Sequence, residues 1–148
     1  ALPDADAEQE IYRRAVRHQL AGWGGRELPA AAVLSVDESQ ALRAASRSVH
    51  VTDELLAYLQ KLAAAVRKSP HVELGVSPRG ALAVLEAGRA MALLSERDFL
   101  LPDDLKRLLV PCWAHRLILS AESELEGHTA RSVIEEAART VEVPHTAR

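Results

Sequence analysis

The sequence has little aromatic content and little cysteine, and each scarcity excludes something. Aromatic residues make up 3% of the 148 residues, and the only cysteine is Cys112. A single cysteine cannot form an internal disulfide, which favours a reducing compartment. With few aromatic residues, the core must be built from leucine, valine and alanine. This composition predicts closely packed helices rather than a β-sandwich.

Long apolar runs and a strong charge of one sign are also missing. No run reaches the roughly 18 residues of a membrane span, and the N-terminus lacks the basic-then-apolar order of a signal peptide. The formal net charge of −3 gives no electrostatic argument for nucleic-acid binding. We therefore expect a cytoplasmic protein whose partners include neither membrane nor nucleic acid. Because the chain begins at Ala1 without a methionine, we expect it to be a piece of a longer protein.

Motifs for independent catalysis are absent too. The chain has seven glycines and no Gly-Lys-Ser or Gly-Lys-Thr, so by itself it is not expected to bind ATP strongly or to hydrolyse it. There is no G-x-S-x-G nucleophile elbow. Cys112 and His115 have the spacing of half a metal site, and His128 follows, but zinc normally needs four ligands, or three and a water. We expect no metal site, and an enzyme built on Cys112 and His115 is the weakest hypothesis.

What the sequence does contain is a series of helix signals. The clearest helix is expected over residues 53–68, with Thr52 as its cap and an apolar face at three- and four-residue steps. The residues of this face are Leu55, Leu59, Leu62, Ala63 and Val66. Further helices are expected over residues 4–20, 35–48, 78–94 and 129–140. Another helix is expected to begin at Pro102, and Pro111 is expected either to bend it or to restart it. Leu42 and Leu82 are expected to face the core.

These helices are joined by short connectors. Residues 49–51 and 99–101 are expected to be extended, residues 71–76 to form a loop, and the glycine-rich residues 22–29 to form a linker. We therefore predict an all-α fold, a small helical bundle of about five to six helices with short extended connectors.

The start of the helix at residues 78–94 has features that suit an anion. Ser77 can act as the N-cap, and Pro78 fills the first helical position, where a missing N–H costs nothing. Arg79, in the first turn, adds a guanidinium to the partial positive charge of the helix terminus, which favours a phosphate. The same residues also open ordinary surface helices, and local physics alone favours that simpler interpretation.

Several segments, taken in order, resemble the C-terminal lid of AAA+ ATPases of the MoxR family. They are LGVSPRG at residues 74–80, AMALL at 90–94, RDFL at 97–100, LPDDL at 101–105, PCWAHRL at 111–117 and the final Val143-Pro144. The resemblance covers residues 33–144. The chain departs from the family pattern at Glu96, where glycine is usual, at Leu101, where a capping threonine is usual, and at Gly80, where alanine is common.

The resemblance implies that Arg79 is the sensor-2 arginine, which reads the terminal phosphate of ATP, with Ser77 and Pro78 beside it. ATP and Mg would be bound mainly by a core outside this chain, and the chain itself would bind neither. Residues 1–34 would be a helix and linker from the end of that core, and residues 35–148 the helical lid. The parent would be a chaperone-like ATPase in which the lid couples nucleotide state to subunit arrangement.

The partners implied by the resemblance are the lid's own AAA+ core, neighbouring subunits of a ring, with a hexamer as the expectation, and proteins with von Willebrand factor A domains. The alternative function is a stand-alone helical protein–protein interaction module without nucleotide chemistry. Its partner would lie against an exposed apolar groove between helices. A P-loop encoded directly upstream of Ala1 would exclude this alternative.

Overall fold

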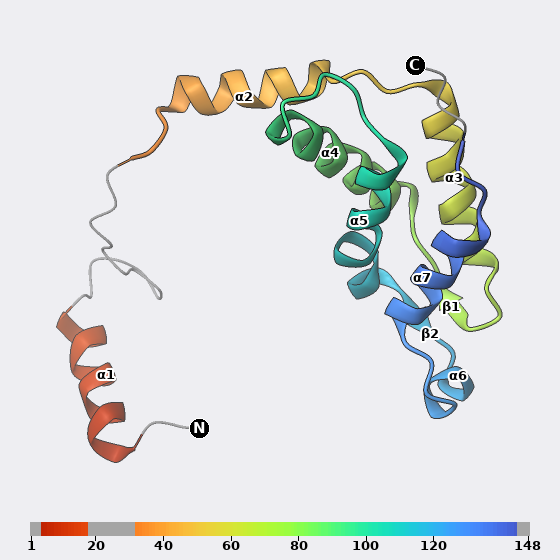
Figure 1. The fold of residues 1–148 in the computed structure, drawn as a ribbon. Coiled ribbons are helices and arrows are strands. Elements are labelled where there is room, and N and C mark those ends of the chain that lie inside the picture. The colour runs from red at the N-terminus through yellow and green to blue at the C-terminus, as the bar shows by residue number, and fades with distance from the viewer. Residues whose placement is uncertain (1–3, 18–31, 145–148) are drawn as a thin grey trace. The chain divides into compact units, whose positions relative to one another are not determined.

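The computed structural model describes residues 4–17 and 32–144, and this part of the chain is mostly helical (Figure 1). Its seven α-helices are α1 (Ala5–Arg17), α2 (Val36–Ser48), α3 (Asp53–Lys68), α4 (Pro78–Leu94), α5 (Pro102–Trp113), α6 (Ala121–Leu125) and α7 (Ala130–Thr140). A 3-10 helix, η1 (Ala114–Arg116), follows α5. The strands β1 (Val72–Leu74) and β2 (Ile118–Leu119) form a small antiparallel pair. The predicted all-α fold is confirmed.

The chain divides into two compact units, residues 1–35 and residues 36–148. The first contains α1, whose N-terminus is capped by Asp4: a carboxylate oxygen accepts the N–H of Ala7 at 2.9 Å. The predicted linker at residues 22–29 and the last three residues of the predicted helix 4–20 lie outside the described residues. No helix in the described ranges is both long and apolar enough to cross a membrane.

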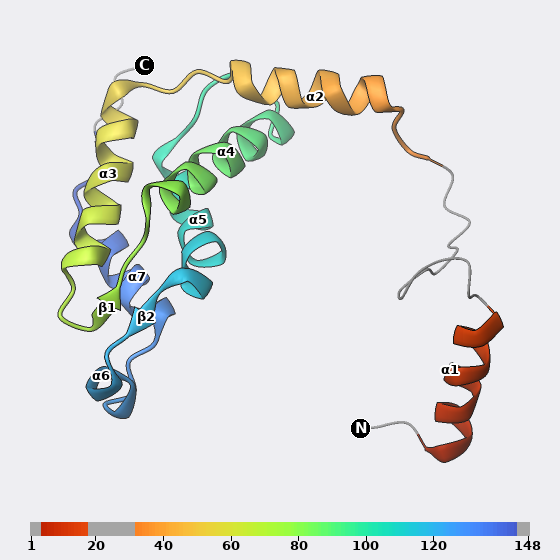
Figure 2. The same ribbon diagram turned by 180° about the vertical axis from the view of Figure 1, so that it is seen from behind.

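The second unit contains the hydrophobic core. Within it, α3 packs against α7, and α4 packs against α5 (Figures 1 and 2). The predicted apolar face of α3 is confirmed, because all five of its residues are buried. Thr52 caps this helix, and its side-chain oxygen accepts the N–H of Leu55. Trp113, at the end of α5, is fully buried and is the largest such side chain in the described core.

Two side chains expected in the core are instead exposed: Leu82 to 57% and Leu42 to 45%. In α4 the buried face is made mainly of small residues, and Leu82 lies on a different side of the helix. The buried residues of α4 are Gly80, Val84, Leu85, Gly88 and Ala92. Helix α2 has no buried residue, so the apolar spacing around Leu42 does not lead to burial within the described chain.

Two further expectations are corrected by the structure. Residues 71–76 are not only a loop, because β1 pairs with β2 there. Of the two outcomes expected at Pro111, a bend or a restart, the restart does not occur, because α5 continues to Trp113. The short helix α6, which follows Ser120, was not predicted. Pro111 lies in the last turn of α5, where a missing backbone N–H removes few helical hydrogen bonds.

The connector between α4 and α5 is held by an ion pair. Arg97 donates two hydrogen bonds to the carboxylate of Asp104, at 2.7 and 2.8 Å, and these bonds raise the pKa of Arg97. The same carboxylate accepts the N–H of Leu101 at 3.0 Å, which compensates for the missing capping side chain at Leu101. Glu96 has φ of +56°, a left-handed conformation that glycine adopts more easily.

Candidate anion-binding site at the start of helix α4

The first turn of α4 is formed as its sequence predicts. Ser77 is extended, with φ −74° and ψ 162°, and its side-chain oxygen accepts the N–H of Gly80 at 3.2 Å. Pro78 is the first residue of a 17-residue helix. Ser77 is therefore the N-cap, and Pro78 stands where its missing N–H costs no helical bond.

The segment that leads into this turn is packed tightly against the end of α3. Arg67 donates from Nε to the carbonyl oxygen of Val76 at 2.6 Å. A Cβ atom added at Gly75 would lie 2.8 Å from Cγ of Arg67 and 3.0 Å from its Cα. Only glycine fits between these segments without displacement, so β1 is joined closely to α3 just before the cap.

The other side of the turn is held by α5. Nε1 of the buried Trp113 donates to the carbonyl oxygen of Gly80 at 2.9 Å. A Cβ atom at Gly80 would lie 2.9 Å from Cγ1 of Val76, whose side chain is buried. Contacts with α3 and α5 thus fix the start of α4, and the direction in which its first N–H groups point is set by the core.

Arg79 lies in this fixed turn with its side chain exposed. Its guanidinium makes no hydrogen bond or ion pair with any residue in ranges 4–17 and 32–144. Helices α2, α3 and α5 each carry acidic residues in the first turn, whereas α4 carries none. The positive helix terminus and Arg79 are therefore free to interact with an external anion.

A second cation lies beside the same turn. Cδ of Arg116 is 3.6 Å from the position that a Cβ of Gly80 would occupy, and the side chain of Arg116 is exposed. Its Nε donates to Nε2 of His115 at 3.1 Å. The sequence pattern assigned no role at this turn to Arg116 or to Arg67. The signal for Arg116 is its place in the PCWAHRL segment, far from Arg79 in the sequence.

The pair considered for catalysis is not assembled into a site of that kind. Cys112 is half-buried against the core, and His115 is exposed and bonded to Arg116. Neither belongs to a group of three or more metal-ligating side chains in the part of the chain that the structure describes. Such a group exists elsewhere, at His71, Glu126 and His128.

Comparison with known families gives a match to a family described as the AAA lid domain. The match covers residues 64–137, which is half of the chain. Among solved structures, a candidate ATPase from Cytophaga hutchinsonii superposes with a TM-score of 0.74 and 25% identity, covering 97% of this chain and 44% of that one.

Three curated proteins are also similar to the chain. Chaperone MoxR1 of Mycobacterium tuberculosis is 26% identical over 151 residues, or 96% of this chain and 38% of that protein. Protein MoxR of Paracoccus denitrificans is 39% identical over 71 residues, or 47% and 21%. Uncharacterized protein YeaC of Bacillus subtilis is 37% identical over 98 residues, or 66% and 31%. The chain spans less than half the length of each of these relatives.

Proposed function

The chain belongs to the AAA lid domain family, and on this basis we propose that it acts as the lid of a MoxR-type AAA+ ATPase in which Arg79 is the sensor-2 arginine. The observation that carries the proposal is the state of Arg79. It is exposed, it has no partner among the described residues, and it lies at a helix start that lacks first-turn acids.

Arginine suits this role because its guanidinium stays charged and can donate two parallel hydrogen bonds to phosphate oxygens. While the terminal phosphate is present, Arg79 binds it and holds the lid against the nucleotide. Loss of that phosphate removes the partner of the guanidinium and releases the lid. Because contacts with Trp113 and Arg67 fix the first turn of α4, a pull on Arg79 moves the whole helical unit rather than one side chain.

The residues at the start of α4 fit a phosphate but not Mg²⁺. They offer backbone N–H groups and guanidinium cations, whereas Mg²⁺ takes oxygen ligands, chiefly carboxylates, phosphates and water. ATP supplies the phosphoryl group whose transfer to water drives such ATPases. In this proposal ATP and Mg²⁺ are held mainly by a core outside the chain, and the lid contributes the positively charged groups at the start of α4 to one side of the nucleotide site.

The family also supports a proposal about the parent protein. The lid would couple nucleotide state to the arrangement of subunits in a ring, in contact with its own core and with neighbouring subunits. We place the boundary near residue 35, where the two compact units meet in the sequence. The helix and linker derived from the core precede this boundary, and the lid follows it. A chaperone role, a hexameric ring, a cytoplasmic location and partners with von Willebrand factor A domains remain predictions from the resemblance.

The test uses a protein that carries this lid together with its ATPase core. We expect Arg79→Ala to lower ATP turnover severalfold or more, because a charged donor to the phosphate is lost, while circular dichroism of the lid stays unchanged. Arg139→Ala is the matched control, since Arg139 is an exposed arginine in the last turn of α7. Turnover that is the same in the Arg79→Ala variant and the wild type would contradict the assignment.

The stand-alone interaction module makes a different prediction, which needs only the coding sequence. An upstream Gly-Lys-Ser or Gly-Lys-Thr loop, followed by an acidic strand end, would place an ATPase core directly before Ala1. Absence of this upstream loop, together with ATP turnover that is unchanged in the Arg79→Ala variant, would favour the interaction module. In both cases the 148-residue chain alone is expected to bind ATP weakly.

A further inference from the structure

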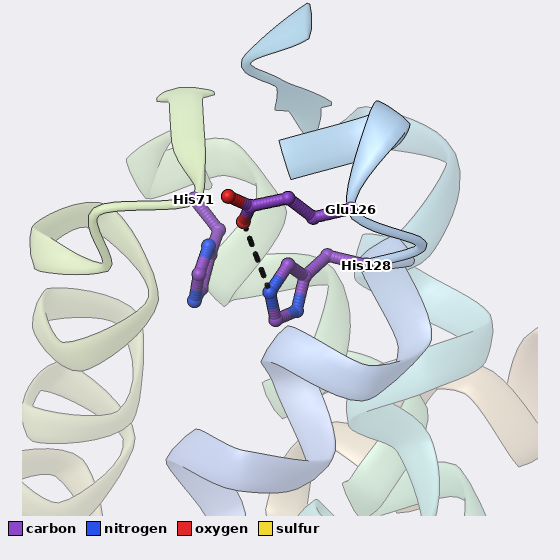
Figure 3. Close-up of side chains that lie close together, drawn as sticks. All are labelled: His71, Glu126 and His128. Carbon is purple, nitrogen blue, oxygen red and sulfur yellow. Dashed lines mark ion pairs between the residues drawn. The ribbon is translucent and has the colours of Figure 1, made fainter. Parts of the chain in front are cut away.

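Two histidines and a glutamate that are distant in the sequence meet at one end of the helical unit (Figure 3). His71 immediately precedes β1, whereas Glu126 and His128 lie in the turn between α6 and α7. A potential ligand atom from each residue lies within 4.8 Å of the other two. The two imidazole rings are stacked, with centroids 3.7 Å apart and an angle of 27° between their planes.

The backbone holds these residues in place. The carbonyl oxygen of His71 accepts the N–H of Ser120 at 3.0 Å, and the N–H of His128 donates to the carbonyl oxygen of Ser123 at 2.9 Å. Between Glu126 and His128, Gly127 adopts φ of +86°, which glycine accommodates without strain. The turn is therefore built so that Glu126 and His128 both approach His71.

Ser123 orients the ring of His71. Ser123 is buried, with 4% of the residue exposed, and its Oγ lies 3.0 Å from Nδ1 of His71. The hydroxyl of Ser120 donates to the same Oγ at 2.9 Å. Metal-ligating histidines are commonly oriented by such outer-shell hydrogen bonds, which fix the tautomer and the ring plane.

We propose that His71, Glu126 and His128 form a binding site for a divalent transition metal ion, with Zn²⁺ as the best fit. Two imidazoles and one carboxylate are a ligand set that suits zinc and leaves a fourth position for water. The ion would tie the start of β1 to the turn between α6 and α7. This site is separate from the anion site, and its test does not depend on the role of Arg79.

The potential ligand atoms of the three residues already lie close to one another. Nε2 of His128 lies 3.6 Å from a carboxylate oxygen of Glu126, close to the spacing of two atoms bound to one zinc ion. The side chains of His128 and Glu126 are 36% and 56% exposed, so they have room to turn, and the stacked rings must turn apart for both imidazoles to bind one ion. As a mere surface ion pair, His128 and Glu126 would contribute little to stability.

The sequence could not show this site because its ligands are separated by most of the second half of the chain. The close spacing of Cys112 and His115 in the sequence resembles half a metal site, yet the fold does not bring either residue into a three-ligand group within the described residues. The site instead depends on the pairing of β1 with β2, which places His71 beside the α6–α7 turn.

The test is calorimetric titration of ZnCl₂ into the full 148-residue chain, purified without a polyhistidine tag and treated with a chelator. We expect one equivalent to bind in the presence of excess Mg²⁺ and to raise the thermal unfolding temperature. Glu126→Gln and the double variant His71→Ala/His128→Ala should weaken binding by more than about 100-fold, and Ser123→Ala by about 10-fold. Circular dichroism establishes that each variant is folded.

The matched controls are Glu124→Gln and His115→Ala, which remove an exposed glutamate from α6 and an exposed histidine outside the cluster. Both should bind zinc as the wild type does. Nitrogen NMR provides a second measurement, in which the ring nitrogens of His71 and His128 shift on zinc addition and those of His115 do not. Equal zinc affinity in the double variant, no binding by the wild type, or shifts confined to other histidines would overturn the proposal.

Discussion

Replacing Gly75 by alanine would place a methyl group where the end of α3 already lies. The new Cβ would be 2.8 Å from Cγ of Arg67 and 3.0 Å from its Cα. The side-chain carbon is restrained by the 2.6 Å hydrogen bond from Nε of Arg67 to Val76, and the Cα belongs to the helix backbone. Overpacking of this kind costs about 1–3 kcal/mol. Because one of the two close contacts involves backbone, we expect the free energy of unfolding to fall by about 2 kcal/mol.

The sign of the effect distinguishes this explanation from a conformational one. The φ of Gly75 lies outside the left-handed region, so without the close contacts an alanine would stabilise the protein by about 0.4–1 kcal/mol. Gly127→Ala is the contrasting variant, because Gly127 has φ of +86° and nothing within 4 Å of its added Cβ. That variant should cost about 1 kcal/mol through backbone strain alone.

Urea unfolding followed by circular dichroism measures both variants. A double-mutant cycle with Arg67→Ala adds a specific check, since removing Cγ relieves the 2.8 Å contact and leaves the 3.0 Å contact with Cα. Gly75→Ala should therefore cost less in the Arg67→Ala background, by about 1 kcal/mol. A neutral or stabilising effect of Gly75→Ala in the wild-type background would refute the close packing of Gly75 against Arg67 just before the Ser77 cap.

Three further variants test other parts of the fold. Glu96→Gly should raise the free energy of unfolding by about 1 kcal/mol in urea titrations, since φ of +56° is strained for glutamate, and a loss of stability would contradict this. Asp104→Asn should lower the free energy of unfolding by about 2 kcal/mol, because it removes the negative charge that pairs with Arg97 through two hydrogen bonds. The side chain of Arg97 is only 22% exposed, so water would solvate the unpaired cation incompletely, and an unchanged urea midpoint would refute this. Burial raises the pKa of Tyr58, whose hydroxyl has no partner among the described residues, so the stability from its neutral form is complete below about pH 10 and is lost as pH rises through the raised pKa. Tyr58→Phe should remove this part of the decline above about pH 10, and an identical pH profile would exclude Tyr58 as its source.

Local signals in the sequence predicted the helices well. Thr52, Ser77 and Thr129 each cap a helix in the structure, because a cap acts over only three residues. The buried face of α3 follows in the same way from the spacing of its apolar residues. Leu82 was misplaced because glycine and alanine share the buried face of α4 with Val84 and Leu85, so large apolar residues alone do not mark the limits of that face.

Non-local features could not be predicted. Strand β1 has three residues and β2 has two, which is too short for an alternating pattern to be recognised. The contacts of Arg67 and Arg116 around the start of α4 depend on how α3 and η1 meet that helix in space. The exposed position of Arg79 follows from its local sequence, whereas its proposed role in reading a phosphate comes from the resemblance to the MoxR family.

The hydrogen bond from Trp113 to Gly80 has a practical consequence. The indole is completely shielded from water and its donor group touches the same turn that carries Arg79. Rearrangement of that turn would change the polarity around the indole, so the fluorescence of Trp113 provides a built-in optical signal for it. In a Trp23→Phe background, which leaves Trp113 as the sole tryptophan of the chain, the emission maximum would follow motion of this turn without an attached dye.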